Sequence, residues 1–404
     1  MNAAVVVIFA LVYLGMFLGE LPGLALDRTG VALLGAIAVV ALGRHPIDRA
    51  WAAVDMRTIA LLFAMMVISA QFRLAGFYTR VARQLVVAQA SPASLLALVV
   101  GVAGLLSAVL TNDIVCLAMT PVLVEGCAQR KLDPLPFLLA LACAANVGSA
   151  GTLIGNPQNI LIGQALHLSF RGYLIDAGVP ALLGLGVTWA VIAFQYRGRW
   201  QREIPPPQIH APPFDRWQST KGLIVTVALM GAFLFAHRLP REGIALVCAG
   251  ILLLSRRMAS REMMSLVDWQ LLVLFVGLFI VNDAFEQTGM PERAVELLRA
   301  RGADARHPAA LFGISAVLSN IVSNVPATML LLPRATHPMA GAILGLASTF
   351  AGNLIIVGSI ANIIVVTAAR PLGVAIDFKT HARTGVPVTV ATLAIAALWL
   401  ALRA

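Results

Sequence analysis

Four short polar stretches interrupt long apolar runs, and they hold the residues of this chain that could bind an ion or a substrate. Asn recurs in all four, and an Asn amide can both donate and accept hydrogen bonds. In three of them Gly or Pro accompanies it and would break a helix, which exposes unpaired N–H groups at one new end and unpaired carbonyl groups at the other. The first kind of end favours an anion and the second favours a cation. This is the chemistry of a binding site rather than of a catalytic one.

The four stretches lie at 111–113, 148–159, 323–326 and 352–359, and we expect them to converge on one site near the middle of the membrane. We expect no cofactor other than Na+ or H+ as a coupling ion, with any sodium held at Asn112 and Asp113 and at Ser323 and Asn324. The candidate residues for substrate or ion binding are Thr111, Asn112, Asp113, Asn146, Gly155, Asn156, Pro157, Asn159, Ser323, Asn324, Thr328, Asn353, Gly358, Ser359 and Asn362.

Asp113 is the acidic residue that most strongly indicates ion coupling. It lies between two apolar runs, where a charged side chain is costly and usually functional. Its counterpart in the second half of the chain is Val325, so the predicted site is asymmetric, as a single coupling site requires. We therefore expect Asp113 to change its protonation or its ion occupancy during transport. Asp283 and Glu286 follow a long apolar run, and a solvated place at its end explains them equally well.

Structural roles are the alternative for several of these residues. N-capping of a helix would explain the polar residues at the two expected hairpin tips. A helix kink would explain Gly155 and Pro157, and a hydrogen bond between helices would explain Asn146 and Asn353. Capping and transport are compatible, so the functional and structural interpretations both stay open on the sequence alone.

The composition places these stretches in a membrane protein. The chain has 404 residues, of which 59% are hydrophobic and 12% are charged. A soluble domain would carry about twice that charged fraction. Apolar runs such as Asn2–Leu18 and Tyr173–Ala193 are long enough to cross a bilayer, which takes ~20 residues. We read the first run as a span rather than a signal peptide, because it has no basic region before it and no cleavage site after it. We expect a multi-pass protein of the inner membrane whose surface faces lipid.

The net charge of +10 does not indicate a nucleic-acid partner, because the Lys and Arg residues lie in short loops between apolar runs. Such loops stay in the cytoplasm or face lipid headgroups. All four cysteines lie inside apolar runs without a CxxC pair, and the histidines have no HExxH spacing. A Cys or His metal site and a soluble catalytic domain are therefore not expected.

The polar stretches belong to an internal repeat. A segment that begins at Val54 matches one that begins at Val267, including Asp55 with Asp268 and Gly76 with Gly289. A second block pairs Ser107–Pro121 with Ser319–Pro333, so that Asn112 meets Asn324. A third block pairs Ala145–Ile162 with Gly352–Val366, so that Asn146 meets Asn353, Gly155 meets Gly358 and Asn159 meets Asn362. Duplicated halves are typical of secondary transporters.

The repeat divides the chain into 1–196, the first transmembrane repeat, and 222–404, the second. Between them lies 197–221, a Pro-rich stretch with several basic residues, which reads as an extended cytoplasmic linker. We expect an all-α polytopic protein with two inverted-topology repeats. Each repeat would hold about five spans, one re-entrant hairpin and one broken helix. Thr111–Asp113 would form the tip of the first hairpin and Ser323–Pro326 the tip of the second.

The motifs at these positions resemble the ion transporter superfamily. They are TNDIVCLAMTP and SNVPATMLLLP in the hairpins, and NVGSAGTLIGNPQNILIG and GNLIIVGSIANIIVV in the broken helices. The nearest branches are the arsenite/antimonite efflux permeases (ArsB), the NhaD-type sodium/proton antiporters and the anion permeases grouped with them. The resemblance covers Val54–Ala369. The related divalent anion/sodium symporters carry Ser-Asn-Thr where this chain has Thr111-Asn112-Asp113 and Ser323-Asn324-Val325, so the last hydroxyl of that motif is absent here at both tips.

The resemblance implies homodimers that move their substrate by an elevator-like step, with ten spans plus two hairpins per chain. Three functions compete. The first is a proton- or sodium-coupled transporter of a small inorganic or carboxylate anion, such as arsenite or antimonite. The second is a sodium/proton antiporter, and the third is a passive channel or an intramembrane enzyme. A dedicated cation exchanger would be expected to have more than one acidic residue inside the membrane, and only Asp113 is clearly placed there. No nucleophile elbow, zinc signature or phosphate loop supports an enzyme. We therefore favour the anion transporter.

Overall fold

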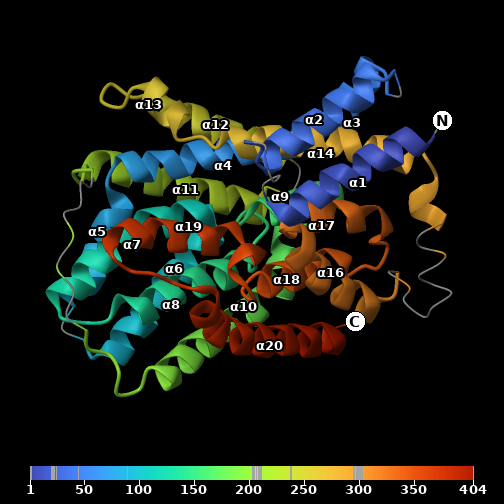
Figure 1. The fold of residues 1–404 in the computed structure, drawn as a ribbon. Helices are drawn as coiled ribbons and strands as arrows, with labels where there is room; N and C mark the ends of the chain where they lie inside the picture. Colours follow the sequence, from blue (N-terminus) through green and yellow to red (C-terminus); the bar gives the residue numbers. More distant parts are fainter. Residues whose placement is uncertain are drawn as a thin grey trace.

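The computed structural model describes residues 2–19, 23, 25–43, 45–88, 90–202, 205, 207, 212–236, 239–293, 296, 304 and 306–403. Its first ten helices are α1 (Asn2–Leu18), α2 (Arg28–Ala41), α3 (Ile47–Ala53), α4 (Met56–Leu74), α5 (Phe77–Val87), α6 (Pro92–Val109), α7 (Asn112–Gln129), α8 (Pro134–Ser149), α9 (Pro157–Ala165) and α10 (Phe170–Gln195). These helices form one end-to-end series, drawn from blue to green in Figure 1.

The described helices of the second series follow in the same order as those of the first. It contains α11 (Arg216–Phe235), α12 (Arg241–Leu253), α13 (Ser260–Ser265), α14 (Trp269–Glu286), α16 (Pro308–Val322), α17 (Asn324–Leu331), α18 (Ala340–Ala351), α19 (Ile360–Ala369) and α20 (Phe378–Arg403). Short 3-10 turns lie at Leu332–Arg334, Ile356–Gly358 and Arg370–Leu372. The described residues form helices joined by turns and isolated bridges, which confirms the all-α fold class.

Six described helices are long and apolar enough to cross a membrane by length and composition: α4, α6, α10, α11, α14 and α20. The shorter apolar helices include α8 and α18, each of which continues after a break into α9 or α19. The pairs α6 with α7 and α16 with α17 pack against each other across a tight tip, as the two hairpins require. The chain is therefore a multi-pass membrane protein with one hairpin and one broken helix in each series.

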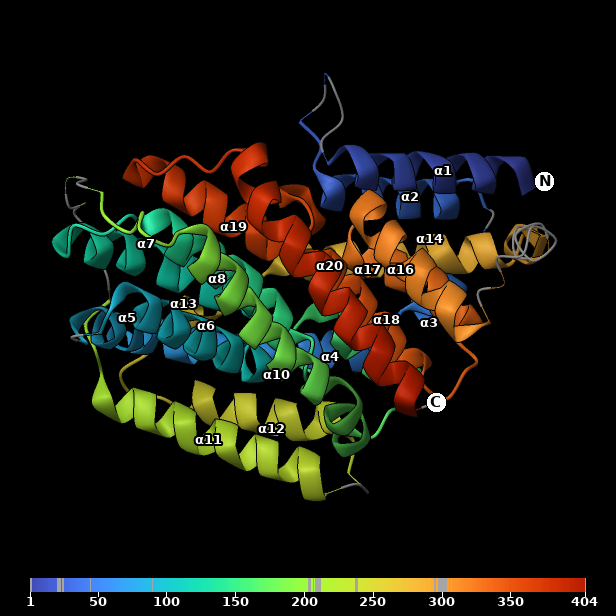
Figure 2. The ribbon, with the colours of Figure 1, turned by 90° about the horizontal axis from the view of Figure 1, so that it is seen from below.

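The two series are interleaved. In the first, α1 and α2 pack against α14 of the second, and in return α11 and α12 pack against α4. Figure 2 shows α1 and α2 along one edge of the molecule and α11 and α12 along the opposite edge. In Figure 1 α4 and α14 reach toward opposite ends, as expected for repeats of inverted topology. Neither series could bury its apolar surface alone in this arrangement.

Helices α8 and α18 lie inside the protein. Every residue of α18 is buried, and α8 is buried along nearly its whole length, with α6, α7 and α10 packed around it. Apolar helices of this kind have no face left for lipid, unlike α10 or α11, which keep exposed Leu and Phe side chains. The breaks that follow α8 and α18 are therefore enclosed by protein, where irregular backbone is tolerated.

The predicted linker 197–221 ends earlier than expected. Its last residues, Arg216–Lys221, form the first turns of α11, because the Asp215 side chain accepts a hydrogen bond from the Gln218 amide at 3.0 Å and caps that helix. Much of the Pro-rich part of the linker lies outside the described residues.

Candidate functional site

The two broken helices are held open by the same device. After α8, the Asn159 side chain donates hydrogen bonds to the carbonyl oxygens of Ser149 at 3.2 Å and Thr152 at 2.9 Å. After α18, the Asn362 side chain donates to the carbonyl oxygens of Gly352 at 2.8 Å and Ile355 at 3.2 Å. These carbonyls are the groups that each break leaves without a helical partner. Asn159 and Asn362 therefore have a structural role in addition to any role in binding.

Asn146, near the end of α8, joins two of the four predicted stretches, 111–113 and 352–359. Its side-chain nitrogen donates to the Oδ1 atoms of Asn353 at 2.8 Å and Asn362 at 3.1 Å. Its side-chain oxygen accepts from the Ser359 hydroxyl at 2.8 Å and from the Asn112 amide at 3.4 Å. All five side chains are buried. The tip of the first hairpin, the end of α8 and the second broken helix thus meet at one amide, which we call the Asn146 cluster.

Thr349 has the matching position in the second series, and sequence reasoning missed it. Its hydroxyl accepts from Asn156 at 3.3 Å and from Gln158 at 3.2 Å, both in the first broken helix. Asn156 also caps α9 by accepting from the Asn159 amide at 2.8 Å. Thr349 thus contacts the opposite broken helix, as Asn146 does. The repeat alignment paired Asn146 with Asn353, and these contacts show that Thr349 is its equivalent.

This equivalence corrects the register of the third repeat block near its beginning. The alignment inserted four residues after Asn146 in order to keep Asn146 opposite Asn353. The carbonyl partners show instead that Ser149 corresponds to Gly352 and Thr152 to Ile355, without an insertion. The sequence contained a signal for this register. The spacing that pairs Gly155 with Gly358 and Asn159 with Asn362, extended toward the N-terminus without a gap, pairs Asn146 with Thr349.

The tip of the first hairpin is anchored on both sides. The Asn112 amide nitrogen donates to the Gly155 carbonyl at 3.2 Å, and the Thr111 hydroxyl donates to Ser69 of α4 at 3.2 Å. No side-chain cap bond forms at the start of α7. The Asn112 side-chain oxygen is buried and has no hydrogen-bond partner among the described residues. N-capping therefore does not explain Asn112.

Gly155 and Pro157 each have a clear geometric reason. A Cβ atom on Gly155 would collide with the backbone of Ser149 and with the Ser107 carbonyl oxygen, at 2.7 Å. Pro157 is the first residue of α9, where its missing N–H costs nothing. Gly358 is similarly tight, because an added Cβ would lie 2.7 Å from the Asn320 side-chain oxygen. The close backbone approach at both glycines is what lets the broken segments reach the hairpins.

The tip of the second hairpin is built differently. Ser323 adopts φ 74° and ψ 161°, a conformation that is essentially reserved for Gly. The side-chain oxygens of Asn324 and Thr328 are buried without a hydrogen-bond partner among the described residues. No hydrogen bond links Ser323, Asn324 or Thr328 to the Asn146 cluster within the described part of the chain. The structure therefore does not bring these three residues into direct contact with the cluster, although α17 packs on α9 and α18.

Asp113 follows Asn112 in the first turn of α7 and is half-buried. Its carboxylate has no ion pair with a described residue. The other two acids considered lie elsewhere and are paired. Asp283 lies 3.2 Å from His45 Nε2 and Glu286 pairs with Arg334, at the far end of α14. Of these three acids, Asp113 is thus the one beside the cluster.

The comparisons with known proteins agree with this architecture. The chain matches the model of the family described as "Citrate transporter" over residues 4–344. An uncharacterized transporter of Mycobacterium tuberculosis is 31% identical over 406 residues, which cover 93% of this chain and 94% of the relative. A silicon efflux transporter of rice (Oryza sativa subsp. japonica) is 27% identical over 455 residues, with 93% of each chain covered.

Two solved structures have the same fold. The YdaH transporter of Alcanivorax borkumensis superposes with a TM-score of 0.61 at 15% identity, covering 98% of this chain and 95% of that one. MtrF of Neisseria gonorrhoeae superposes with a TM-score of 0.58 at 12% identity, covering 98% and 93%. These likenesses support the fold of two inverted repeats, and the family match fits the resemblance to the ion transporter superfamily. The chain is a membrane transport protein, not an enzyme, and it belongs to the citrate transporter family.

Proposed function

We propose that this protein is a secondary active transporter that carries a small inorganic or carboxylate anion across the inner membrane. The observation that supports this most is the Asn146 cluster. Helices α7 and α19 begin at Asn112 and Ile360, beside residues that contact Asn146. Their N-termini supply partial positive charge, and the Asn and Ser side chains supply hydrogen-bond donors. An anion can be bound in this way without an arginine.

Substrate entry would exchange protein–protein hydrogen bonds for protein–substrate bonds. In the present arrangement the Asn146 amide is fully engaged by Asn353, Asn362, Ser359 and Asn112. A carboxylate or oxyanion offers acceptor oxygens to the same donors. The hydrogen bond from Asn112 to Asn146, at 3.4 Å, is the longest of the four. Separating the first hairpin from Asn146 is therefore the least costly way to open the cluster.

We further propose that Asp113 couples transport to H+ or Na+. The unpartnered oxygens of Asn112, Asn324 and Thr328 are of the kind that a Na+ ion takes as ligands. We propose that residues 1–196 and 222–404 are the two repeats, that the chains form homodimers and that substrate moves by an elevator-like step. The names of relatives suggest probes: citrate for the family, silicon for the rice protein and arsenite for a Dictyostelium discoideum protein named "Putative transporter arsB".

The test is uptake of citrate, arsenite and silicic acid by proteoliposomes under an imposed proton or sodium gradient. Asp113→Asn should abolish the dependence of uptake on the coupling gradient. Asp283→Asn is the matched control, since Asp283 also lies beside an apolar span but is paired with His45 away from the cluster. Sodium/proton exchange without any anion uptake would instead establish the antiporter. Wild-type coupling in the Asp113→Asn protein would remove Asp113 from the mechanism.

A further inference from the structure

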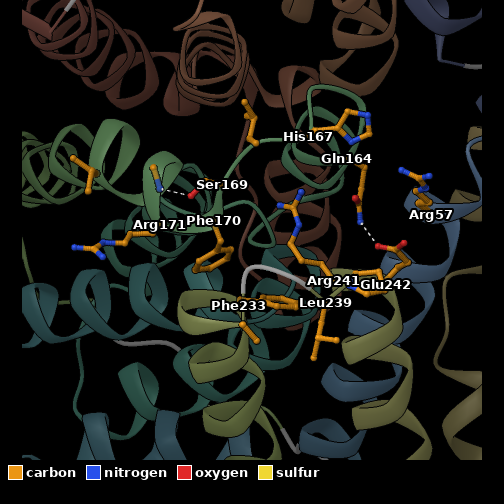
Figure 3. Close-up of a pocket in the computed structure, with 15 residues that line it drawn as sticks. Arg57, Gln164, His167, Ser169, Phe170, Arg171, Phe233, Leu239, Arg241 and Glu242 are labelled. Atoms are coloured by element: carbon orange, nitrogen blue, oxygen red, sulfur yellow. Dashed lines mark hydrogen bonds between the residues drawn. The ribbon is translucent and has the colours of Figure 1, made fainter.

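A cleft with a volume of about 890 Å³ opens where α4 begins, α9 ends and α11 connects to α12. Figure 3 shows side chains from all of these elements gathered around it. We call it the basic cleft and define it by Arg57, His167, Arg171, Arg241 and Glu242. It lies at the C-terminal end of α9, the helix whose N-terminal end is bound to Thr349.

The charge of the basic cleft is not neutralised from within. Three arginines and one glutamate line it. Arg241 is fixed by donating to the Gly163 carbonyl at 2.7 Å, and Glu242 accepts from Gln164 at 3.4 Å. Arg57 and Arg171 are exposed and form no ion pair with a described residue. Two guanidinium groups therefore remain available, and a guanidinium binds carboxylates and oxyanions through two parallel hydrogen bonds.

A second cleft occupies the equivalent place in the repeat and has the opposite charge. It has a volume of about 480 Å³ and opens where α14 begins and α1 connects to α2. We call it the acidic cleft, and its charged residues are Asp27, Arg28 and Asp268. Arg28 and Arg241 are the first residues of α2 and α12, so they correspond. In the register that pairs Asp55 with Asp268, Arg57 corresponds to Gln270.

The packing of the helices explains why the two clefts exist but not why their charges differ. Both clefts follow from packing a helix connection of one repeat on the fourth helix of the other, so their existence needs no function. Their opposite charge does not follow from that packing. Inverted repeats place equivalent positions toward opposite sides of the membrane. One side of the protein therefore presents a surface that attracts anions, and the other presents one that does not.

We infer that the basic cleft is an anion-binding entry site, whose arginines attract a carboxylate, oxyanion or phosphate group to the place where the first broken helix ends. As a route for substrate this inference rests on the proposed function. As a binding site it stands independently, because anion binding by the cleft does not require transport. A cleft with an excess of one sign of charge, here three arginines against Glu242, raises the local concentration of the opposite ion by about tenfold.

The test measures the rate at which a cysteine in each cleft reacts with two thiosulfonate reagents of similar size, one with a sulfonate and one with a trimethylammonium group. His167→Cys reports on the basic cleft and Gln270→Cys on the acidic cleft. The four native cysteines are buried and should not react. The ratio of the anionic to the cationic rate should be about tenfold higher for His167→Cys than for Gln270→Cys.

Neutralising variants identify the residues responsible. Arg57→Gln and Arg171→Gln should each lower the ratio at His167→Cys several-fold, and Arg57→Lys should largely preserve it, since charge rather than shape attracts the reagent. Millimolar citrate should slow labelling of His167→Cys and leave Gln270→Cys unchanged. Equal ratios in the two clefts, or an unchanged ratio in the Arg→Gln variants, would overturn the inference.

The lipid composition of the vesicles distinguishes two sources of the bound anionic group, a soluble anion and a lipid headgroup. In vesicles of phosphatidylcholine, protection of His167→Cys by citrate supports a site for soluble anions. If phosphatidylglycerol vesicles slow the labelling and citrate then adds nothing, the cleft holds a lipid headgroup and the entry site is refuted. Loss of citrate uptake in every preparation would refute the proposed substrate while leaving the labelling result intact, so the two failures are distinguishable.

Discussion

The asparagines of the four polar stretches divide into two groups by what their side chains contact. Asn159 and Asn362 use their amides to satisfy carbonyl oxygens freed by the helix breaks. Asn112 and Asn324, at the two hairpin tips, donate to no freed carbonyl, and each keeps a buried side-chain oxygen without a partner among the described residues, as Asn159 also does. A buried polar atom left unpaired costs about 1–3 kcal/mol of stability. Such an atom in a folded protein calls for an explanation, and binding of an ion or a substrate provides one here. The sequence alone treats these four residues as equals.

Asn112→Ala and Asn324→Ala should each abolish transport and change the thermal stability little, because each removes an unsatisfied oxygen and Asn112 loses in addition only its long 3.4 Å bond to Asn146. Asn159→Ala is the contrasting variant. It leaves several buried carbonyls unpaired, so it should lower the free energy of unfolding by about 1–3 kcal/mol or more. Uptake into proteoliposomes and thermal unfolding in detergent measure the two effects. Full transport by both hairpin variants would exclude the tips from the binding site.

At the scale of the elements, the position of α8 depends on its close contact with α6 of the first hairpin. A Cβ atom on Gly148 would collide with the backbone of Gly104 in α6, so these two helices approach without side chains between them. Small residues permit this kind of approach in membrane proteins. The contact places the end of α8, and with it Asn146, beside the hairpin tip.

Gly148→Ala should destabilise the protein by about 1–3 kcal/mol, since the new methyl group can be accommodated only by moving the backbone of α6. Gly186→Ala in α10 is the matched control, because nothing lies within 4 Å of the position of its added Cβ. That variant should be neutral or slightly stabilising, as Ala favours helix more than Gly does. Thermal unfolding of both proteins in the same detergent provides the comparison. Equal unfolding temperatures would show that α6 and α8 are not tightly packed.

The two hairpins should respond oppositely to glycine at the tip. Ser323 is in a strained conformation that costs about 1–3 kcal/mol, so Ser323→Gly should raise the unfolding temperature. Thr111 has φ −70° and donates to Ser69, so Thr111→Gly loses a hydrogen bond and gains backbone freedom in the unfolded state. It should lower the unfolding temperature. A decrease for both variants would mean that Ser323 is not strained.

At the scale of the whole molecule, the two repeats are linked by contacts near the outer ends of their helices. The loop after α2 places His45 between Asp283 of α14 and Gln287, the residue that follows this helix, at 3.2 and 3.3 Å. Arg334, at the end of the second hairpin, pairs with Glu286 of the same helix. Helix α14 is thus the element to which both the first repeat and the second hairpin are fastened.

Acid should weaken this junction through His45. Burial lowers the pKa of His45 below its ordinary value, with Asp283 opposing that shift and Arg49 adding to it. The folded protein therefore binds a proton at His45 less readily than the unfolded chain does. The resulting stability is present at neutral pH and is lost as the pH falls through about 6.5, the pKa of the unfolded residue.

The unfolding temperature at pH 5.5 and 7.5 measures this effect, with His45→Gln as the comparison. The wild-type protein should lose more stability on acidification than His45→Gln, by about 2 °C or more. His307→Gln, the same substitution at an exposed histidine of another element, is the control. An identical decrease in the wild-type and His45→Gln proteins would show that other groups carry the acid sensitivity.

The sequence by itself determined the class, the repeat and the positions of the breaks. Apolar runs of membrane-spanning length and the scarcity of charge are local properties, and so are the Gly, Pro and Asn residues that interrupt a helix. The repeat was legible because Asp55 with Asp268 and Gly76 with Gly289 match in an ungapped register.

Only the tertiary structure decided which partners these residues contact. The meeting of Asn146 with Asn353 and Asn362, the place of Thr349 and the packing of α1 and α2 on α14 join segments far apart in the chain. An amide can donate and accept in many directions, so its residue type does not select its partner. The distance to the candidate donors and acceptors selects it, and that distance is set by how the two repeats interleave.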